Sequence, residues 1–594
     1  MTQKKICILG GGVAGMSAAH ELAERGFSVD VFDRNPLYVG GKARSVNVPD
    51  TNIISPDGYL PGEHGFRFFP GFYKHVTDTM KRIPFKDGKS VFDNLVSTDT
   101  VEIAQKGLMP IIAPVHFPTS WENIVEIFES FMQAEKELSK AEIDFFSMRI
   151  WQLMTSCSDR FLDEYESISW WEYLKADTFS SAYQTLLVDG LTRSLVACQA
   201  QMASTRTVGT IFLQLLYLMI DIDSNTTDRV LNGPTNDQWL NPWLAYLQSL
   251  KVNYNKGQNV TQIFMKDGLI SGAELTDINT KAIKNISGYD YYLLCTPVER
   301  AAALINNDML KVDESLQNII KLAPNVRWMN GIQFYLNKEV NLNKGHTIYS
   351  NSHWALTSIS QIQFWAGYDL KNKGNGKVVS ILSVDISDWT ALGNFNNKAA
   401  EDCTRDEVKE EVWKQLKEEL NIGGTTILSD DMIEFVYLDR DIHPVEPALT
   451  GIVQNLLTSS EFDSMQKLNN REPLLVNQTD TWCLRPNAFT AIANLFLAAD
   501  YVKTNTDLAT MEGANEAARR AVNNILKVSG SDAPLCEIWK YTQPSILGLF
   551  QDGDKNNYAK GLTWQQPFVD KILLEGKKLV DDAEGLVKKI MNKI

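Results

Sequence analysis

The chain has 594 residues, of which 57 are Lys or Arg and 73 are Asp or Glu, so its formal net charge is −16. This length exceeds a single hydrophobic core, which stops growing near roughly 250–300 residues, and it therefore predicts several domains. A hydrophobic content of 44% and a charged content of 22% exclude a disordered chain. The acidic balance argues against a nucleic-acid partner, because phosphates require a basic surface.

Cysteine and histidine positions show no metal-ligand spacing. The chain contains neither a CxxC pair nor an HExxH motif, so we expect no metal site, and the scattered cysteines indicate a reducing compartment. Glycines interrupt the N-terminal apolar run, and no stretch reaches the ~18–20 apolar residues of a transmembrane helix. We therefore expect a cytoplasmic protein that is soluble or peripheral to a membrane.

The N-terminal segment carries a dinucleotide-binding pattern: a buried strand, a GxGxxG turn, a helix, a second strand and an acid. In such a unit the glycines let the backbone approach a pyrophosphate at the helix N-terminus, and the acid accepts hydrogen bonds from ribose hydroxyls. The pattern comprises residues 5–9, Gly10, Gly12, Val13, Ala14, Gly15, 28–32, Asp33 and Arg34.

Two further glycine motifs follow. Seven residues past Asp33, a second glycine pair with basic neighbours would approach and neutralise the pyrophosphate, although taken alone it equally fits a polar turn. The next loop joins an acid, a histidine and a glycine to a run of aromatic residues. These motifs read Gly40-Gly41-Lys42-Ala43-Arg44 and Gly62-Glu63-His64-Gly65-Phe66-Arg67.

The C-terminal third supplies another strand–helix unit. Trp482-Cys483-Leu484-Arg485-Pro486 precedes an apolar strand that continues through Ala499 and ends in Asp500. An Ala-rich helix then begins near Thr510-Met511-Glu512 and includes Ala514. A weaker pattern between these ends predicts a hairpin near Val260 and a strand that ends at Thr296-Pro297, for which an ordinary core strand is an equal alternative.

Together these motifs resemble the flavin amine oxidase superfamily and, within it, the plant and cyanobacterial phytoene desaturases. The resemblance implies an FAD cofactor. It also implies that Asp500 holds the ribityl-phosphate region, that the helix start at 511–514 faces the flavin, and that Val260 contacts the adenine through its backbone. The implied cofactor contacts are Gly10, Gly12, Val13, Ala14, Gly15, Asp33, Arg34, Gly40, Gly41, Lys42, Ala43, Arg44, Gly65, Phe66, Arg67, Val260, Thr296, Ala499, Asp500, Thr510, Met511, Glu512 and Ala514.

The chain departs from the family pattern at two positions. Arg67 stands where plant-type members carry His, and Ala499 stands where the family has Gly. Arg67 and His64 are the candidate catalytic residues. Arg67 would bind an anionic group of the substrate or pair with a carboxylate such as Glu63, and His64 would transfer a proton or serve as a hydrogen-bonding loop residue.

These elements predict an α/β fold with a discontinuous, Rossmann-like FAD-binding domain formed by residues 1–100, 233–325 and 475–530. Residues 101–232 and 326–474 are expected to form an inserted, mixed α+β substrate domain, and residues 531–594 a helical C-terminal extension. From residue 568 on, apolar residues recur at helical spacing beside lysines. That helix would touch a membrane surface or, as we favour, pack on the body or on a partner subunit.

The resemblance implies an FAD-dependent oxidoreductase that moves a hydride from an apolar or amphipathic substrate to flavin N5, as in a desaturase or dehydrogenase of C–C bonds. The cofactor performs this chemistry, and the protein supplies position, electrostatics and exclusion of water. The electron acceptor would be oxygen, a quinone or another carrier. An amine or L-amino-acid oxidase with Arg67 as a carboxylate clamp, and a flavin-dependent isomerase or mutase, remain alternatives.

Overall fold

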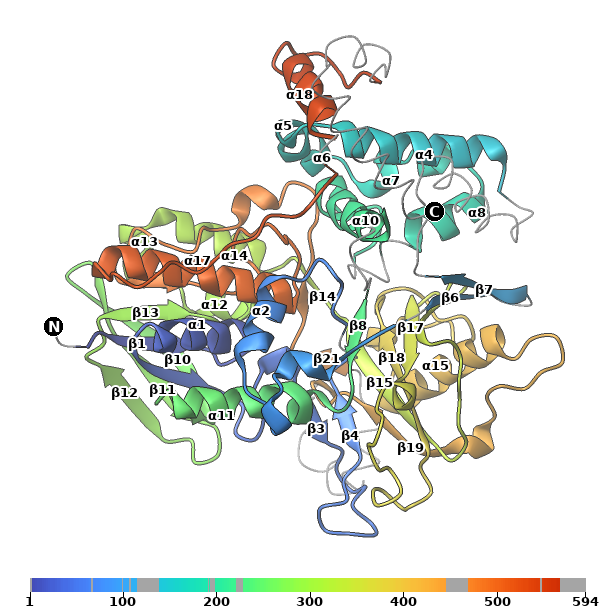
Figure 1. Cartoon of the computed structure of the whole chain (residues 1–594), viewed down its shortest axis with the longest axis horizontal. Helices are drawn as coiled ribbons and strands as arrows, with labels where there is room; N and C mark the ends of the chain where they lie inside the picture. The colour runs from blue at the N-terminus through green and yellow to red at the C-terminus, as the bar shows by residue number, and fades with distance from the viewer. Residues whose placement is uncertain are drawn as a thin grey trace, which may run out of the picture.

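The computed structural model describes residues 3–65, 68–98, 100–105, 108–114, 138–190, 192, 198–220, 228–444, 468–544 and 547–566. Phe66, Arg67 and the predicted helix from residue 568 on lie outside the described residues. The described residues form a parallel sheet with its helices, a larger second sheet and a group of helices above both (Figure 1).

A five-stranded parallel sheet forms the first region, and this finding confirms the predicted Rossmann-like α/β fold. Its strand order is β23-β13-β1-β2-β9. Leu9 pairs with Phe32 and with Leu294, and Leu294 pairs with Leu497, so four strands end at the same edge. The central strands are apolar and buried, as expected when helices cover both faces. The strands are β1 (Lys5–Leu9), β2 (Ser28–Asp33), β9 (Asn253–Lys256), β13 (Tyr291–Leu294) and β23 (Leu495–Leu497).

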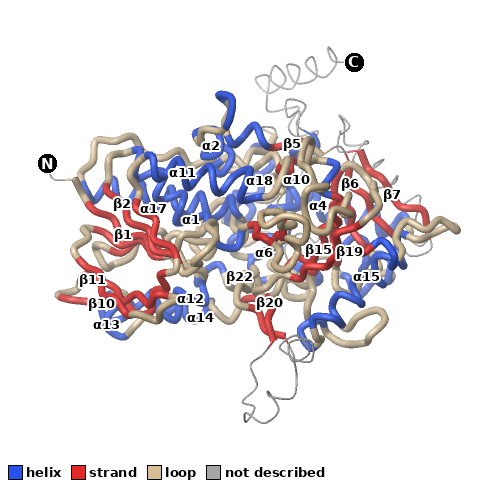
Figure 2. Tube along the Cα trace, turned by 90° about the horizontal axis from the view of Figure 1, so that it is seen from below, coloured by secondary structure: helices blue, strands red, loops and turns tan. Residues whose placement is uncertain are grey.

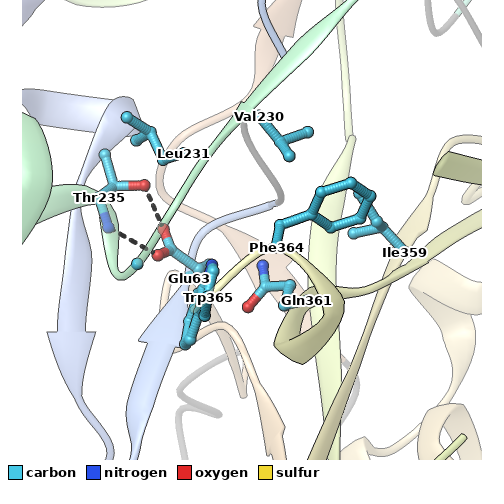
Figure 3. A pocket seen from close by; sticks show the side chains of 9 residues that line it. Glu63, Val230, Leu231, Thr235, Ile359, Gln361, Phe364 and Trp365 are labelled. Atoms are coloured by element: carbon cyan, nitrogen blue, oxygen red, sulfur yellow. Dashed lines mark hydrogen bonds between the residues drawn. The ribbon is translucent and has the colours of Figure 1, made fainter. Parts of the chain in front are cut away.

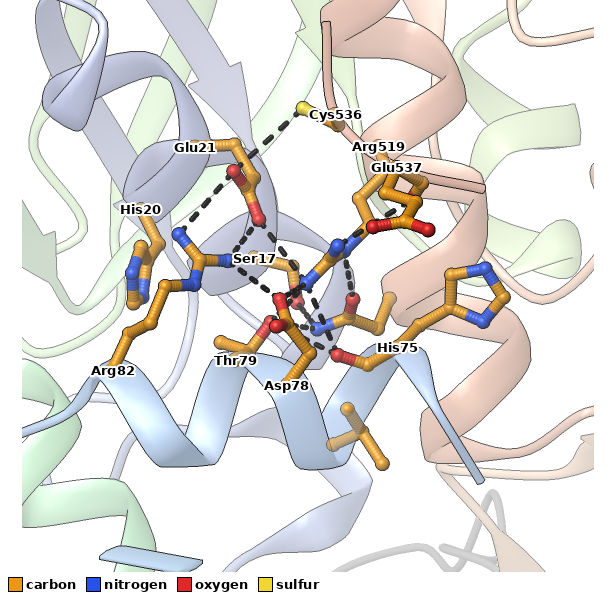
Figure 4. Close-up of polar contacts among 12 residues, drawn as sticks. Ser17, His20, Glu21, His75, Asp78, Thr79, Arg82, Arg519, Cys536 and Glu537 are labelled. Atoms are coloured by element: carbon orange, nitrogen blue, oxygen red, sulfur yellow. Dashed lines mark hydrogen bonds and ion pairs between the residues drawn. The ribbon is translucent and has the colours of Figure 1, made fainter. Parts of the chain in front are cut away.

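Three helices from opposite ends of the chain pack together beside this sheet. A buried polar cluster joins them (Figure 4). Arg519 donates to Asp78 at 2.5 Å and lies 3.3 Å from Glu21, which also pairs with Arg82. The cluster thereby fixes the first predicted segment of the FAD-binding domain, residues 1–100, against the last, residues 475–530. The helices are α1 (Val13–Glu24), α2 (His75–Arg82) and α17 (Met511–Ser529).

The same region contains further helices and a small antiparallel sheet. The predicted hairpin near Val260 is present as the first two strands of that sheet. The elements are α11 (Asn241–Ser249), α12 (Val298–Leu304), α13 (Asn307–Val312), α14 (Gln317–Leu322), β10 (Gln258–Lys266), β11 (Leu269–Asp277) and β12 (Ile283–Ser287).

The second region is a seven-stranded sheet of order β19-β15-β18-β17-β16-β6-β7. All its neighbouring strands are antiparallel except β16 and β6. Helix α15 (Arg405–Leu420) covers it and begins with a capping box formed by Thr404 and Glu407. The strands are β6 (Thr100–Gln105), β7 (Leu108–Pro114), β15 (Asn330–Leu336), β16 (Gly345–Tyr349), β17 (Leu356–Ser360), β18 (Ser380–Ile386) and β19 (Ile433–Leu438).

The helical region has an apolar core of its own, in which Trp170, Tyr173 and Tyr183 are fully buried. Helix α18 packs on α4 and α5, so part of the predicted C-terminal extension closes this region. Of the helices in the described part of the chain, none has the length and apolarity required to cross a membrane. The helices are α4 (Lys140–Thr155), α5 (Ser158–Leu162), α6 (Glu164–Ser167), α7 (Trp170–Tyr173), α8 (Ser181–Tyr183), α10 (Thr205–Ile220) and α18 (Leu547–Tyr558).

Short strand pairs complete the fold, and the view from below shows β1 and β2 of the parallel sheet at one side and β6 and β7 of the seven-stranded sheet at the other (Figure 2). The parallel sheet draws its strands from parts of the chain that are far apart in sequence, which a discontinuous domain requires. The predicted domain boundaries themselves remain a prediction. The short pairs are β3 (Ser45–Asn47) with β4 (Pro61–Glu63), β5 (Leu95–Ser97) with β8 (Arg229–Leu231), β14 (Val326–Arg327) with β22 (Leu474–Leu475), and β20 (Ile442–Pro444) with β21 (Leu468–Asn470).

Candidate functional site

The glycine turn after β1 is fixed by close backbone packing. Gly10 has a φ of +110°, and a Cβ atom there would lie 2.7 Å from the carbonyl oxygen of Cys295. A Cβ atom on Gly15 would lie 1.9 Å from the carbonyl oxygen of Gly10. On Gly12 the nearest atom to such a Cβ would be Gly41 Cα at 3.8 Å. The first and third glycines are therefore required by the fold, whereas Gly12 borders open space.

The first turn of α1 faces this open space without a side-chain cap. Gly12 is the N-cap residue, and the first turn carries no acidic residue. A helix N-terminus has unsatisfied N–H groups and a positive dipole end, so this geometry suits an anionic group. Val13 and Ala14, both predicted contacts, occupy this turn and are buried.

Asp33 closes the turn from the end of β2. Its carboxylate accepts hydrogen bonds from the backbone N–H groups of Gly11 and Asn35, each at 2.8 Å. Burial raises the pKa of this carboxyl group, although these two hydrogen bonds oppose the shift. Asp33 therefore organises the glycine turn itself, and its predicted bond to a ribose hydroxyl remains a prediction.

The predicted basic residues meet a chain segment that the sequence did not indicate. Arg34 pairs with Glu472, Lys42 donates to the carbonyl oxygen of Pro473, and Arg44 pairs with Asp441. Burial alone would raise the pKa of Glu472, but the neighbouring Arg34 and Lys42 outweigh it and lower the pKa. These cations therefore lie together beside the glycine turns, and each has a protein partner.

Four side chains near the carboxyl ends of β13 and β23 have buried polar atoms without a hydrogen-bond partner among the described residues. They are Thr296 through Oγ1, Asp500 through Oδ1, Tyr501 through its hydroxyl oxygen and Glu299 through both carboxylate oxygens. Unpaired buried polar atoms are costly and indicate a missing partner. Thr296 and Asp500 were predicted from the sequence, whereas Glu299 was not. The sequence feature that could have indicated Glu299 is its position, three residues after Thr296 at the predicted end of a strand.

The carboxyl group of Glu299 is hard to ionise in its surroundings. This residue stands in the first turn of α12. Burial raises the pKa of its carboxyl group, and nearby Asp500 and Glu472 add to the shift, while Lys42 opposes it. A neutral carboxyl group can donate a hydrogen bond, which an ionised one cannot.

Helix α17 packs on β23, the strand that precedes Asp500. Thr510 caps the helix by accepting a hydrogen bond from Gly513 N at 3.1 Å. The Glu512 carboxylate points elsewhere: it accepts bonds of 2.8–2.9 Å from the backbone N–H groups of Lys74, His75 and Val76 and thereby caps α2. The predicted role of Glu512 toward a cofactor is therefore limited to its backbone.

The loop that follows β4 packs on the seven-stranded sheet. His64 is buried and forms an ion pair with Asp439, which favours its structural alternative. Burial alone would raise the pKa of Asp439, but His64 and Arg44 outweigh it and lower the pKa. A Cβ atom on Gly65 would lie 2.7 Å from Asp385 Oδ1, so this glycine is required for packing against β18.

A small cavity borders the same loop (Figure 3). Its volume is about 20 Å³, enough for a water molecule but not for a substrate. Glu63 lies at its edge and accepts hydrogen bonds from Thr235 N at 3.0 Å and from Thr235 Oγ1 at 2.9 Å. This carboxylate therefore fixes the loop.

The remaining predicted contacts lie around these elements. Gly40 has a φ of +93° and forms a parallel bridge with Gly12, so the two glycine turns are adjacent. Ala43 and Ala499 are buried, and the methyl group of Ala499 is accommodated where the family carries Gly. Val260 is half-buried on β10, which contacts β2.

Comparisons with known proteins agree with this geometry. A family model described as an NAD(P)-binding Rossmann-like domain matches residues 8–83. Over 42 residues, 7% of this chain and 8% of the relative, the sequence is 55% identical to 4,4'-diaponeurosporene oxygenase of Staphylococcus haemolyticus. Over 115 residues, 18% of this chain and 22% of the relative, it is 32% identical to carotenoid 3,4-desaturase of Haloarcula japonica. The matched segments thus span less than a quarter of these relatives' lengths.

Solved structures match most of the chain at low sequence identity. Putrescine oxidase has a TM-score of 0.56 and 10% identity, with 88% of this chain and 99% of that chain covered. Cyclohexylamine oxidase from Brevibacterium oxydans has a TM-score of 0.55 and 12% identity, with 89% of this chain and 100% of that chain covered. The chain therefore has the Rossmann-like fold of these oxidoreductases. Together, the comparisons show a Rossmann-like fold and a partial sequence similarity to carotenoid-modifying enzymes.

Proposed function

We propose that the chain is an FAD-dependent oxidoreductase. The observation that carries this proposal is the set of unpaired buried polar atoms on Thr296, Glu299 and Asp500. They lie at the carboxyl edge of the parallel sheet, beside the uncapped start of α1. Ligands of open α/β sheets bind outside this edge, so the residues fit a dinucleotide cofactor.

Each part of the site would hold a different part of FAD. The start of α1 and the two glycine turns would bind the diphosphate, with Lys42 and Arg34 near it. Asp500 and Thr296 would accept or donate hydrogen bonds to hydroxyl groups of the cofactor. FAD would supply the redox chemistry, and this chain would orient it and exclude water.

Within that class we propose a desaturase or dehydrogenase that acts on C–C bonds of an apolar or amphipathic substrate. The carotenoid enzymes among the sequence relatives support this choice. The electron acceptor would be oxygen, a quinone or another carrier.

The test begins with purified protein incubated with FAD. We expect yellow protein whose flavin absorbance is lost in Asp500→Ala. Anaerobic bleaching of the flavin by a long-chain isoprenoid, and not by amines or amino acids, would support the desaturase. Peroxide release with amines or amino acids would contradict it in favour of an oxidase, and wild-type protein that binds no FAD would overturn the whole proposal.

A further inference from the structure

A buried charge cluster lies behind the proposed cofactor site, between the helical region and the loop that joins β23 to α17. It consists of two arginines and two carboxylates, so the burial of its charges is balanced. All four side chains are almost completely buried: Glu166, Arg206, Arg485 and Asp507.

Arg485 occupies the centre of the contacts. This residue belongs to the Trp482–Pro486 motif of the sequence. It donates to the carbonyl oxygen of Asp500 at 2.7 Å and to Asn477 Oδ1 at 2.9 Å, and its Nε lies 3.4 Å from Asp507 Oδ1. One planar guanidinium therefore ties the end of β23 to the loop before α17.

Asp507 is held from the other side. Its φ of +42° is unusual for a residue other than glycine, so surrounding contacts must maintain it. Thr207 Oγ1 donates to its carboxylate at 2.8 Å, and Asn477 Nδ2 donates to both its carbonyl and carboxylate oxygens at 2.9 Å. Arg206 completes the set with an ion pair.

Arg206 extends the cluster into the helical region. Its Nε donates to Glu166 at 3.1 Å, and its guanidinium lies 3.8 Å from the ring centroid of Trp482. Glu166 in turn accepts a bond of 2.8 Å from Trp482 N. The Trp482–Arg485 segment is thereby clamped between α6, α10 and the loop of Asp507.

We propose that Arg485 is a positioning residue for the cofactor: through Asp500 and Asp507 it fixes the distance between the end of β23 and the start of α17. This inference rests on the proposed binding of FAD. Asp500 and Met511 would contact the cofactor directly, whereas Arg485 acts on it only through Asp500 and Asp507.

The experiment uses the full chain and three readouts: the FAD dissociation constant, the visible flavin spectrum and the flavin midpoint potential. For Arg485→Met we expect the FAD dissociation constant to rise roughly tenfold to a hundredfold, the range typical for residues that orient metal ligands without touching the metal. We also expect a shifted flavin spectrum and midpoint potential. Arg485→Lys keeps the charge but not the planar fork and should recover only part of the loss.

Arg160→Met is the matched control, because Arg160 is equally buried and pairs with Asp554 at 2.9 Å, away from the sheet edge. It should lower the unfolding temperature without changing the three readouts. If Arg485→Met does not fold, Thr207→Val removes a single donor to Asp507 and decides the matter. Wild-type readouts in Arg485→Met, or in Thr207→Val if Arg485→Met does not fold, would overturn the inference, whereas wild-type protein that fails to bind FAD would overturn the proposed function instead.

Discussion

The two large sheets place their polar groups in different ways. In the parallel sheet the central strands β1, β13 and β23 are mostly apolar, and polar side chains gather where strands end, at Asp33, Thr296 and Asp500. In the seven-stranded sheet, β15 and β18 are buried along their whole length but still carry polar side chains, such as Asn330 and Gln333.

This difference indicates that the two sheets have different roles. The polar side chains of β15 bind neighbouring chain segments: Gln333 accepts from Glu63 N at 2.9 Å, and Asn330 donates to Asp439 at 2.9 Å. After the parallel strands, Thr296 and Asp500 have buried polar atoms that lack a hydrogen-bond partner among the described residues. We therefore propose that the first sheet offers groups to a ligand and that the second fixes the loop that borders it.

The largest effect is expected at the glycine turn of the parallel sheet. Gly15→Ala places a methyl group 1.9 Å from the carbonyl oxygen of Gly10, so the loss of stability should exceed the usual overpacking cost of about 1–3 kcal/mol. Denaturant unfolding of the cofactor-free protein measures it, and a variant as stable as wild type would show that the turn is not close-packed.

Gly12→Ala separates the effect on ligand binding from the effect on stability at the same turn. Its methyl group would have no neighbour closer than 3.8 Å, so the cofactor-free protein should remain folded. We expect the FAD dissociation constant to rise by about two orders of magnitude, or about 2.7 kcal/mol, because the methyl group fills the approach to the diphosphate. Unchanged FAD binding would show that the cofactor does not bind at this turn.

A smaller effect is expected from the second sheet. Tyr335→Phe removes a bond of 2.6 Å to the carbonyl oxygen of Pro61, at a cost of about 1–2 kcal/mol in the free energy of unfolding. If about half of this cost also appears as a loss of FAD-binding free energy, the FAD dissociation constant rises about threefold.

Tyr349→Phe is the control in the same sheet, because its hydroxyl group bonds Ser358 at 2.9 Å rather than the loop. It should lower stability by a similar amount and leave FAD binding unchanged. Equal FAD binding in both variants would show that the second sheet does not support the site.

The contrast between the sheets also explains what could be predicted from the sequence. The predicted bounds of β1 and the predicted start of the Ala-rich helix α17 agree with the structure, because apolar periodicity and capping residues act locally. Thr296 and Asp500 were expected as cofactor contacts because the family resemblance places such contacts at these strand ends, and that role stays a prediction. The partners of Arg34 and Arg44 were not predicted, since Glu472 and Asp441 lie about 400 residues away and no local pattern encodes such contacts.

The smallest effect concerns Glu299, whose pKa is raised chiefly by burial. The folded chain therefore retains a proton that the unfolded chain loses, and its stability should fall as the pH rises above the ordinary carboxyl range. Glu299→Gln removes this dependence, so its free energy of unfolding should exceed that of wild type increasingly from pH 4 to pH 8, by about 1 kcal/mol for each unit of the shift.

Denaturant unfolding of the cofactor-free proteins across this pH range measures the difference, with Glu314→Gln as the control at an exposed carboxylate. A constant difference between Glu299→Gln and wild type would mean that Glu299 is ionised throughout. Its unpaired carboxylate would then add a negative charge beside the diphosphate, and Glu299→Gln should strengthen FAD binding. If Glu299 instead donates its proton to a cofactor oxygen, glutamine can replace that donor, and the FAD dissociation constant should change little.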